Sequence, residues 1–172
     1  MRRSFGKGYL SVGAEASEDD RSLQVTPCRG EDLTEIVAIL RACPEATLWS
    51  IASLQGILHE HPDSIFAAWQ GQQIKGFVMG QRAADEIEIL NLAVRPEVRR
   101  CGIGKALVQA LLQRFGGSKD QIRVFLEVRE SNSAGIAFYR GLGFQQVGRR
   151  NNYYREPTEA ALVFSLRLSG TA

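Results

Sequence analysis

The sequence predicts a single α/β domain built on one mixed sheet, which is mostly antiparallel and contains one parallel pair of strands. A hairpin pattern over 64–79 and the strand that follows it indicate antiparallel neighbours. A strand, an amphipathic helix and another strand over 86–128 indicate a crossover, which is right-handed and pairs its strands in parallel. With 172 residues, 44% of them hydrophobic and 23% charged, the chain is long enough to bury one core.

The N-terminal segment differs in composition from the rest of the chain. It contains Gly6, Gly8 and Gly13 with scattered serine and acidic residues, so it can bury little apolar surface. We therefore predict a flexible tail over 1–21 and one domain over 22–169.

The expected strands are rich in aliphatic and β-branched residues. They lie at 23–25, 64–69, 74–79, 86–94, 122–128, 144–149 and 161–168, the last two as an antiparallel pair. About four helices flank the sheet, because apolar residues recur at helical spacing in 31–42, 50–59, 103–115 and after residue 132. Pro44 ends the first helix, Gly116-Gly117 stops the third, and Ser131 or Asn132 caps the fourth.

The most informative segment is the turn between the strand at 86–94 and the helix at 103–115. It runs Arg99-Arg100-Cys101-Gly102-Ile103-Gly104-Lys105. The first N–H groups of a helix lack intrahelical partners and the helix dipole is positive there, so this turn favours a phosphate ligand. Gly102 and Gly104 let phosphates approach the backbone closely. A tight strand-to-helix turn without a ligand would explain the same glycines.

The pattern Arg99-x-x-Gly102-x-Gly104 resembles the acetyl-coenzyme-A signature of the GNAT superfamily of N-acetyltransferases. A second run, Leu-Glu-Val-Arg-Glu-Ser-Asn-Ser-Ala-Gly-Ile-Ala-Phe-Tyr from 126 to 139, matches the same superfamily and is followed by Gly-Leu-Gly-Phe. The resemblance covers 23–168. It is greatest to the bacterial enzymes that acetylate the N-terminal alanine of a small-subunit ribosomal protein.

This resemblance implies a GNAT fold whose sheet is splayed at the parallel pair, with acetyl-CoA as cosubstrate in the split. The cofactor-binding residues that it implies are Leu92, Ala93 and Val94 by their main chain, Arg99, Arg100, Cys101, Gly102, Ile103, Gly104 and Lys105 around the pyrophosphate, and Asn132 on the pantetheine. Structural explanations stay open for some of them. The side chains of Leu92 and Val94 suit a core, and Asn132 suits a helix cap.

Glu127 is the general base that the resemblance implies. It alternates with Leu126 and Val128 and so points to the opposite face of its strand. The structural alternative is simple solvation of this carboxylate on an exposed face.

Tyr139 is the general acid that the resemblance implies. If Ala134, Ala137, Phe138 and Leu142 face the core, its ring lies at the edge of that helix face. A phenol of pKa about 10 can protonate a leaving thiolate of pKa about 8.5. The alternative is a core aromatic with its hydroxyl at the surface.

Other residues bear on the choice of acceptor. The resemblance extends to Arg149-Arg150 and Tyr153-Tyr154, which we expect between the last two strands, where a peptide would enter. Two departures concern the same region. Thr47-Leu48 replaces the Phe-Pro that often precedes Trp-Ser in these enzymes, and Ala160 replaces an acidic residue.

Gross properties exclude several other classes. A net charge of +2 is too small for a dedicated nucleic-acid binder, and no apolar run approaches the roughly 20 residues of a transmembrane helix. Cys28, Cys43 and Cys101 are odd in number and form no CxxC pair, which favours a reducing, cytoplasmic location. His59 and His61 lack further ligands nearby, so no metal site is expected.

The sequence therefore predicts a cytoplasmic N-acetyltransferase acting on a protein N-terminal amine, with a ribosomal peptide as partner and no direct contact to nucleic acid or membrane. Two alternatives remain. One is the same fold acetylating a lysine, a polyamine or another small amine. The other is a non-catalytic module that binds acyl-CoA, which the joint presence of Glu127 and Tyr139 disfavours.

Overall fold

The computed structural model of the chain describes residues 22–116 and 122–168. The predicted tail over 1–21 and the second glycine of the predicted helix stop lie outside these ranges. Within them the prediction of a mixed α/β sheet is confirmed.

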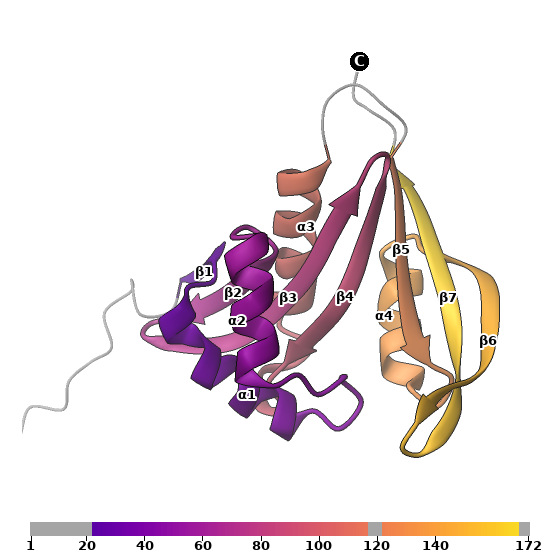
Figure 1. Cartoon of the computed structure of the whole chain (residues 1–172), viewed down its shortest axis with the longest axis horizontal. Coiled ribbons are helices and arrows are strands. Elements are labelled where there is room, and N and C mark those ends of the chain that lie inside the picture. Colours follow the sequence, from indigo (N-terminus) through magenta and orange to yellow (C-terminus); the bar gives the residue numbers. More distant parts are fainter. Residues whose placement is uncertain (1–21, 117–121, 169–172) are drawn as a thin grey trace, which may run out of the picture.

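Seven strands of the described chain form one sheet in the order β1-β2-β3-β4-β5-β7-β6 (Figure 1). The strands are β1 (Leu23–Pro27), β2 (Ile65–Gln70), β3 (Gln73–Ala83), β4 (Glu86–Val94), β5 (Ile122–Arg129), β6 (Gln145–Arg155) and β7 (Thr158–Leu168). All neighbouring pairs are antiparallel except β4 and β5, which run parallel as predicted.

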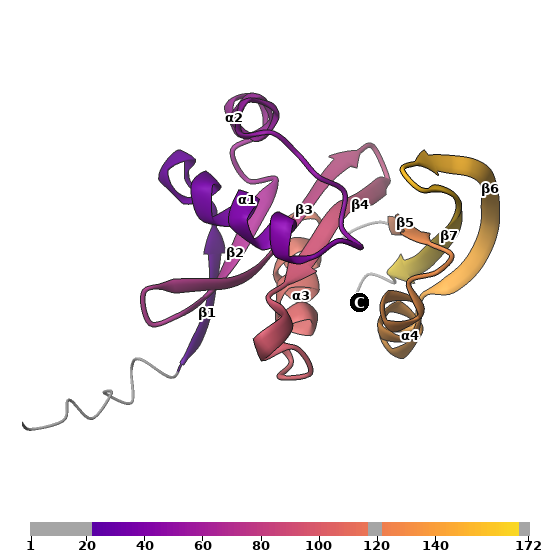
Figure 2. The same cartoon turned by 90° about the horizontal axis from the view of Figure 1, so that it is seen from below.

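Helices cover the two faces of this sheet unequally (Figure 2). The helices are α1 (Leu33–Ala42), α2 (Ile51–Glu60), α3 (Ile103–Phe115) and α4 (Ser133–Gly141), with short 3-10 turns η2 (Gly30–Asp32) and η3 (Pro96–Val98). Helices α3 and α4 lie on one face, and α1 and α2 lie on the other over β1 to β4. The side of β5, β6 and β7 that faces away from α4, which we call the open face, is left without a helix.

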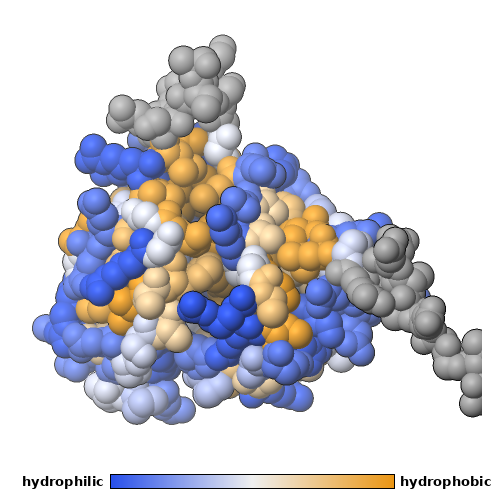
Figure 3. Space-filling model, turned by 180° about the vertical axis from the view of Figure 1, so that it is seen from behind, coloured by the Kyte–Doolittle hydropathy of each residue, from blue (hydrophilic) through white to orange (hydrophobic). Residues whose placement is uncertain are grey.

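Two apolar clusters correspond to this arrangement. One lies under α3 and α4 and includes Leu107, Leu126 and Phe164; the other lies under α1 and α2 and includes Ile36 and Phe77. Apolar side chains also reach the surface on the α3 and α4 face, where they form a band between polar margins (Figure 3).

A β-bulge in β4 changes the direction of its backbone groups. Met79 of β3 pairs with Asn91 and Gly80 pairs with Ile89, so Leu90 is an extra residue. Beyond the bulge, the Arg95 N–H donates to the Lys75 carbonyl at 2.8 Å. Because hydrogen-bonded pairs alternate along an antiparallel ladder, the main chain of Ala93 also faces β3 and that of Leu92 and Val94 faces away from it, toward β5.

The parallel pair separates just past this point. Glu86–Ile89 of β4 pair with Arg123–Leu126 of β5, and the register between the two strands ends there. The strands lie together at one end and diverge toward their carboxyl ends (Figure 1). The splay implied by the resemblance is therefore present, and the main chain of Leu92 and Val94 faces into it.

Two local predictions are wrong. Strand β6 extends to Arg155, so Arg149, Arg150, Tyr153 and Tyr154 lie within a strand and not between strands. In α4 it is Tyr139 that is buried, whereas Ala134 and Ala137 are exposed. The apolar pattern mistook the orientation of α4 because a tyrosine ring is large enough to anchor a helix although its hydroxyl is polar.

Among the described residues, none of the helices has the length and hydropathy needed to span a membrane.

Candidate active site

The predicted site lies at the open end of the split between β4 and β5, which we call the mouth of the split. The carboxyl ends of β4 and β5 and the N-termini of α3 and α4 lie at the same end of the molecule (Figure 1). Ligands of open α/β sheets bind at such carboxyl ends.

The glycine turn has the geometry that its sequence requires. Gly102 is the N-cap of α3 with φ 82°, a left-handed conformation that favours glycine, and no side chain caps the helix. The first N–H groups of α3 are thus left for a ligand. A Cβ at Gly104 would lie 3.2 Å from the Phe138 ring, so a small residue here also lets α3 pack against α4.

The remaining residues of this turn divide into buried and exposed ones. Ile103 is buried in the core, while Arg100, Cys101 and Lys105 are exposed. Arg100 has φ 65°. Neither Arg100 nor Lys105 forms an ion pair within the described part of the chain. Both cations are therefore available to an anionic ligand.

Arg99 differs from its neighbours because three groups already bind it. Its Nε donates to the Val94 carbonyl at 3.1 Å, and its Nη2 lies 3.3 Å from Cys43 Sγ and 2.5 Å from Glu45 Oε1. Cys43 and Glu45 belong to the α1–α2 connection, residues 43–50. The place of Arg99 beside a pyrophosphate stays a prediction.

Asn132 caps α4, since its Oδ1 accepts the Gly135 N–H at 2.8 Å. This confirms Asn132 and not Ser131 as the cap. Its bond to pantetheine is not tested by this contact.

Glu127 lies on the open face, as its alternation predicted. Its carboxylate is 3.0 Å from Arg150 Nη1, and its side chain is 17% exposed against 60% for Arg150. A hydrogen bond with Glu127 and partial burial raise the pKa of Tyr153 to about 12. The predicted base is thus held between a cation and a phenol, both from β6.

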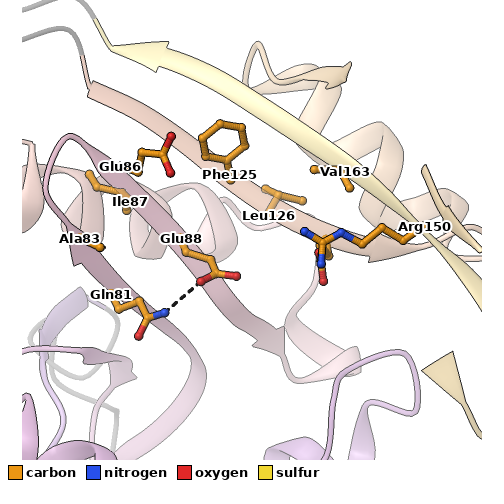
Figure 4. Close-up of a pocket in the computed structure, with 10 residues that line it drawn as sticks. Gln81, Ala83, Glu86, Ile87, Glu88, Phe125, Leu126, Arg150 and Val163 are labelled. Atoms are coloured by element: carbon orange, nitrogen blue, oxygen red, sulfur yellow. Dashed lines mark hydrogen bonds and ion pairs between the residues drawn. The ribbon is translucent and has the colours of Figure 1, made fainter. Parts of the chain in front are cut away.

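A cleft of about 360 Å³ runs along the sheet beside Glu127. Figure 4 shows Arg150 reaching into it, opposite Glu86 and Glu88 of β4. The lining residues are Gln81, Ala83, Glu86, Ile87, Glu88, Phe125, Leu126, Glu127, Arg150 and Val163. An acceptor that reaches Glu127 has room on this side of the sheet.

A second ion pair of the open face joins the end of β5 to the start of β7. Arg129 Nη1 is 3.3 Å from Glu159 Oε2, and each side chain is 15% exposed. The Ser131 N–H donates to Glu159, and the Arg129 guanidinium lies 4.0 Å above the Tyr154 ring. The residues were not predicted together, although Arg129 follows Glu127 by two positions and so had to share its face.

Tyr139 approaches the site from the other face of the sheet. Its ring packs edge-on against Phe138 and Phe144 at 5.1 and 5.7 Å. Burial raises the pKa of the Tyr139 hydroxyl, and Tyr154 adds to the effect. Burial likewise raises the pKa of Tyr154, with Glu127 contributing, so Tyr154 is within electrostatic reach of both predicted catalytic groups.

The α1–α2 connection borders the mouth of the split. The buried Asn91 amide donates to the Thr47 carbonyl at 2.7 Å, and the Cys43 thiol donates to the Val94 carbonyl at 3.5 Å. Leu48 is 69% exposed, and the Trp49 Nε1 is buried without a partner in the described chain. The segment that departs from the family pattern therefore presents an apolar side chain to solvent.

Within the described ranges, no group of three or more His, Cys, Asp or Glu is placed to hold a metal ion. Cys28 and Cys43 are buried, and Cys101 is exposed. Burial raises the pKa of Cys28 to about 12 and also raises that of Cys43, so these two thiols stay protonated.

Comparison with known proteins gives consistent results. The model of the acetyltransferase (GNAT) family matches residues 31–144. The ribosomal protein bS18-alanine N-acetyltransferase of Haemophilus influenzae is 34% identical over 148 residues, which cover 84% of this chain and 97% of the relative.

Solved structures show the same fold. The ribosomal-protein-S18-alanine N-acetyltransferase of Escherichia coli superposes with a TM-score of 0.73 and 27% identity, covering 88% of this chain and 97% of that one. Arabidopsis thaliana NAA60, solved in complex with acetyl-CoA, has a TM-score of 0.72 at 20% identity and covers 86% and 99% of the two chains.

Proposed function

Because this chain belongs to the acetyltransferase (GNAT) family and is an N-acetyltransferase, we propose that it transfers acetyl from acetyl-CoA to the N-terminal alanine of ribosomal protein bS18 in the cytoplasm. The observation that carries the proposal is the placement of Glu127, a carboxylate held by Arg150 and Tyr153 in a cleft beside the split strands. The similarity to a bS18-alanine N-acetyltransferase, which covers 84% of this chain and 97% of that relative, supports this acceptor.

The residues at the split suit acetyl-CoA. The uncapped N-terminus of α3 and the cations Arg100 and Lys105 would hold the pyrophosphate, and the main chain of Leu92 and the N–H of Val94 would bind the pantetheine amides. Ala93, by contrast, directs its main chain to β3 and would contribute no such bond.

Two proton transfers accompany the reaction. The amine nitrogen attacks the thioester carbonyl carbon, the C–N bond forms and the C–S bond breaks. Glu127 accepts the proton that the amine loses, and Tyr139 gives its proton to the departing thiolate. The raised pKa of Tyr139 keeps its hydroxyl protonated until that step.

The energetic cost of deprotonating the acceptor amine favours an N-terminal amine. Deprotonating an α-amine of pKa about 8 near neutral pH costs about 1 kcal/mol, whereas a lysine of pKa about 10.4 costs about 4 to 5 kcal/mol. A single carboxylate base therefore favours a chain end over a lysine side chain.

Two synthetic peptides test the proposal. One begins with the free N-terminal alanine of bS18, and the other has the same sequence with a blocked N-terminus and an internal lysine. After incubation with acetyl-CoA, mass spectrometry is expected to find acetyl on the α-amine of the first peptide alone. Comparable labelling of the blocked peptide would favour lysine or small-amine acetylation, and labelling of neither by an enzyme that binds CoA would favour a binding module.

A further inference from the structure

We propose that Arg99 is a positioning residue for the acceptor side of the site, where it fixes the α1–α2 connection against the carboxyl end of β4, and that it does not bind the cofactor phosphates. The inference rests on the proposed function, because it assigns the α1–α2 connection to acceptor binding.

The side-chain hydrogen bonds of Arg99 lead to that connection and to β4. One Nη atom reaches both Glu45 Oε1 at 2.5 Å and Cys43 Sγ at 3.3 Å, while the Nε holds the Val94 carbonyl at 3.1 Å. The Cys43 thiol donates to that same carbonyl at 3.5 Å. Arg99 and Cys43 thus tie the start of the connection to the last residue of β4.

Charge argues in the same direction. The carboxylate of Glu45 already neutralises the Arg99 guanidinium, so a phosphate would have to displace it. Arg100 and Lys105, in the same turn, are exposed and have no ion-pair partner within residues 22–116 and 122–168. The turn therefore offers other cations to an anionic ligand.

A second anchor holds the same connection farther along. Asn91 donates from β4 to the Thr47 carbonyl, next to the exposed Leu48. Residues 43–47 are thus attached to β4 at both ends, and Leu48 projects from a fixed base. Loss of Arg99 weakens the first attachment, where the Cys43 thiol still binds the Val94 carbonyl, and leaves the second intact, so the connection loosens without unfolding.

The test compares Arg99→Gln, Glu45→Gln and the double variant with wild type. Arg95→Gln is the matched control, since Arg95 leaves the same strand end but contacts the Ile74 carbonyl and Glu35. Calorimetry gives the Kd for CoA, and steady-state kinetics at saturating acetyl-CoA give KM and kcat for the alanine peptide.

We expect Arg99→Gln and Glu45→Gln each to raise the peptide KM about three- to tenfold, with the Kd for CoA and kcat within about twofold of wild type. The double variant should raise the peptide KM no further than Arg99→Gln, because both single changes remove the same Arg99–Glu45 ion pair. Arg95→Gln should leave KM within about twofold.

Hydrogen exchange gives a readout that needs no acceptor. The Ala46 N–H donates to the Cys43 carbonyl at 2.9 Å, and its exchange should become faster in both single variants but not in Arg95→Gln. If wild type acetylates no peptide, the proposed function fails while exchange and CoA binding still decide the role of Arg99.

Two results would overturn the inference. One is a tenfold or greater loss of CoA affinity in Arg99→Gln with an unchanged peptide KM. The other is a Glu45→Gln variant with unchanged peptide KM and unchanged Ala46 exchange, which decides the matter even if Arg99→Gln does not fold.

Discussion

One face of the sheet is covered by helices over part of its width and is open over the rest. Over β1 to β4 it is covered by α1 and α2 and is apolar, with Phe77 and Met79 fully buried. Over β5 to β7 the same face is open and carries ion pairs, among them Glu127 with Arg150 and Arg129 with Glu159.

The difference separates stability from chemistry. Burial of apolar side chains under helices contributes most of the folding free energy, while partly exposed ion pairs contribute little. The open half is therefore where polar groups can be arranged for a reaction at small cost to the fold. Substitutions in the two halves should have opposite signatures.

The largest expected effect is a loss of turnover, caused by substitutions in the open half and at the mouth of the split. Glu127→Gln and Tyr139→Phe should each lower kcat by about 10²- to 10⁴-fold, the usual contribution of a general base or acid. Urea unfolding should stay within about 1 kcal/mol of wild type, because each change keeps the shape of the side chain. Rates near wild type in both variants would contradict the assigned roles.

A pair of phenylalanines measures the contrast in stability. Phe77→Ala, under α1 and α2, should lower the free energy of unfolding by about 3 to 5 kcal/mol. Phe125→Ala, half-buried on the open face, should cost less than half as much. Equal losses in urea denaturation would show that the open face is as important to stability as the covered one.

The smallest effect concerns pH and the Glu159 carboxylate. A hydrogen bond from the Ser131 N–H, with Arg129 adding to it, holds the pKa of Glu159 below its usual value of about 4.3. Its contribution to stability is therefore present above about pH 4.3 and is lost as the pH falls through the lower folded-state pKa. Urea midpoints of wild type and Glu159→Gln should differ slightly at pH 7, and the difference should shrink as the pH falls below about 4.3; a difference that does not shrink with falling pH would exclude this cause.

Much of the fold could be predicted from the sequence, because both halves obey local rules. Strand β4 and helix α3 begin and end as their periodicity and flanking glycines indicated, and β5 alternates buried with exposed or half-buried residues because one face is open. The second half of strand β6 was not predicted, because nearly all residues of this strand are exposed and no alternation of polar and apolar residues marks that half.

The candidate site was only partly predictable, for a related reason. Motif positions such as Glu127 and Gly102 follow from the chain itself. The partners of Glu127 come from β6, more than 20 residues away, and the partners of Arg99 come from residues 43 and 45. Such pairings depend on strand order and on a loop conformation, which no local pattern encodes.

The bulge at Leu90 also sets a rule for how this chain can vary. The first half of β4 pairs with β5, and its second half borders the split. One extra residue between the two halves changes whether odd- or even-numbered residues direct their main chain away from β3. If the ladder continued past Ile89 without the bulge, Leu92 and Val94 would turn to the opposite side of the sheet and the main chain of Ala93 would face into the split. Side chains in this strand can therefore be exchanged over time, but the bulge between Ile89 and Asn91 has to stay as long as Leu90 is present.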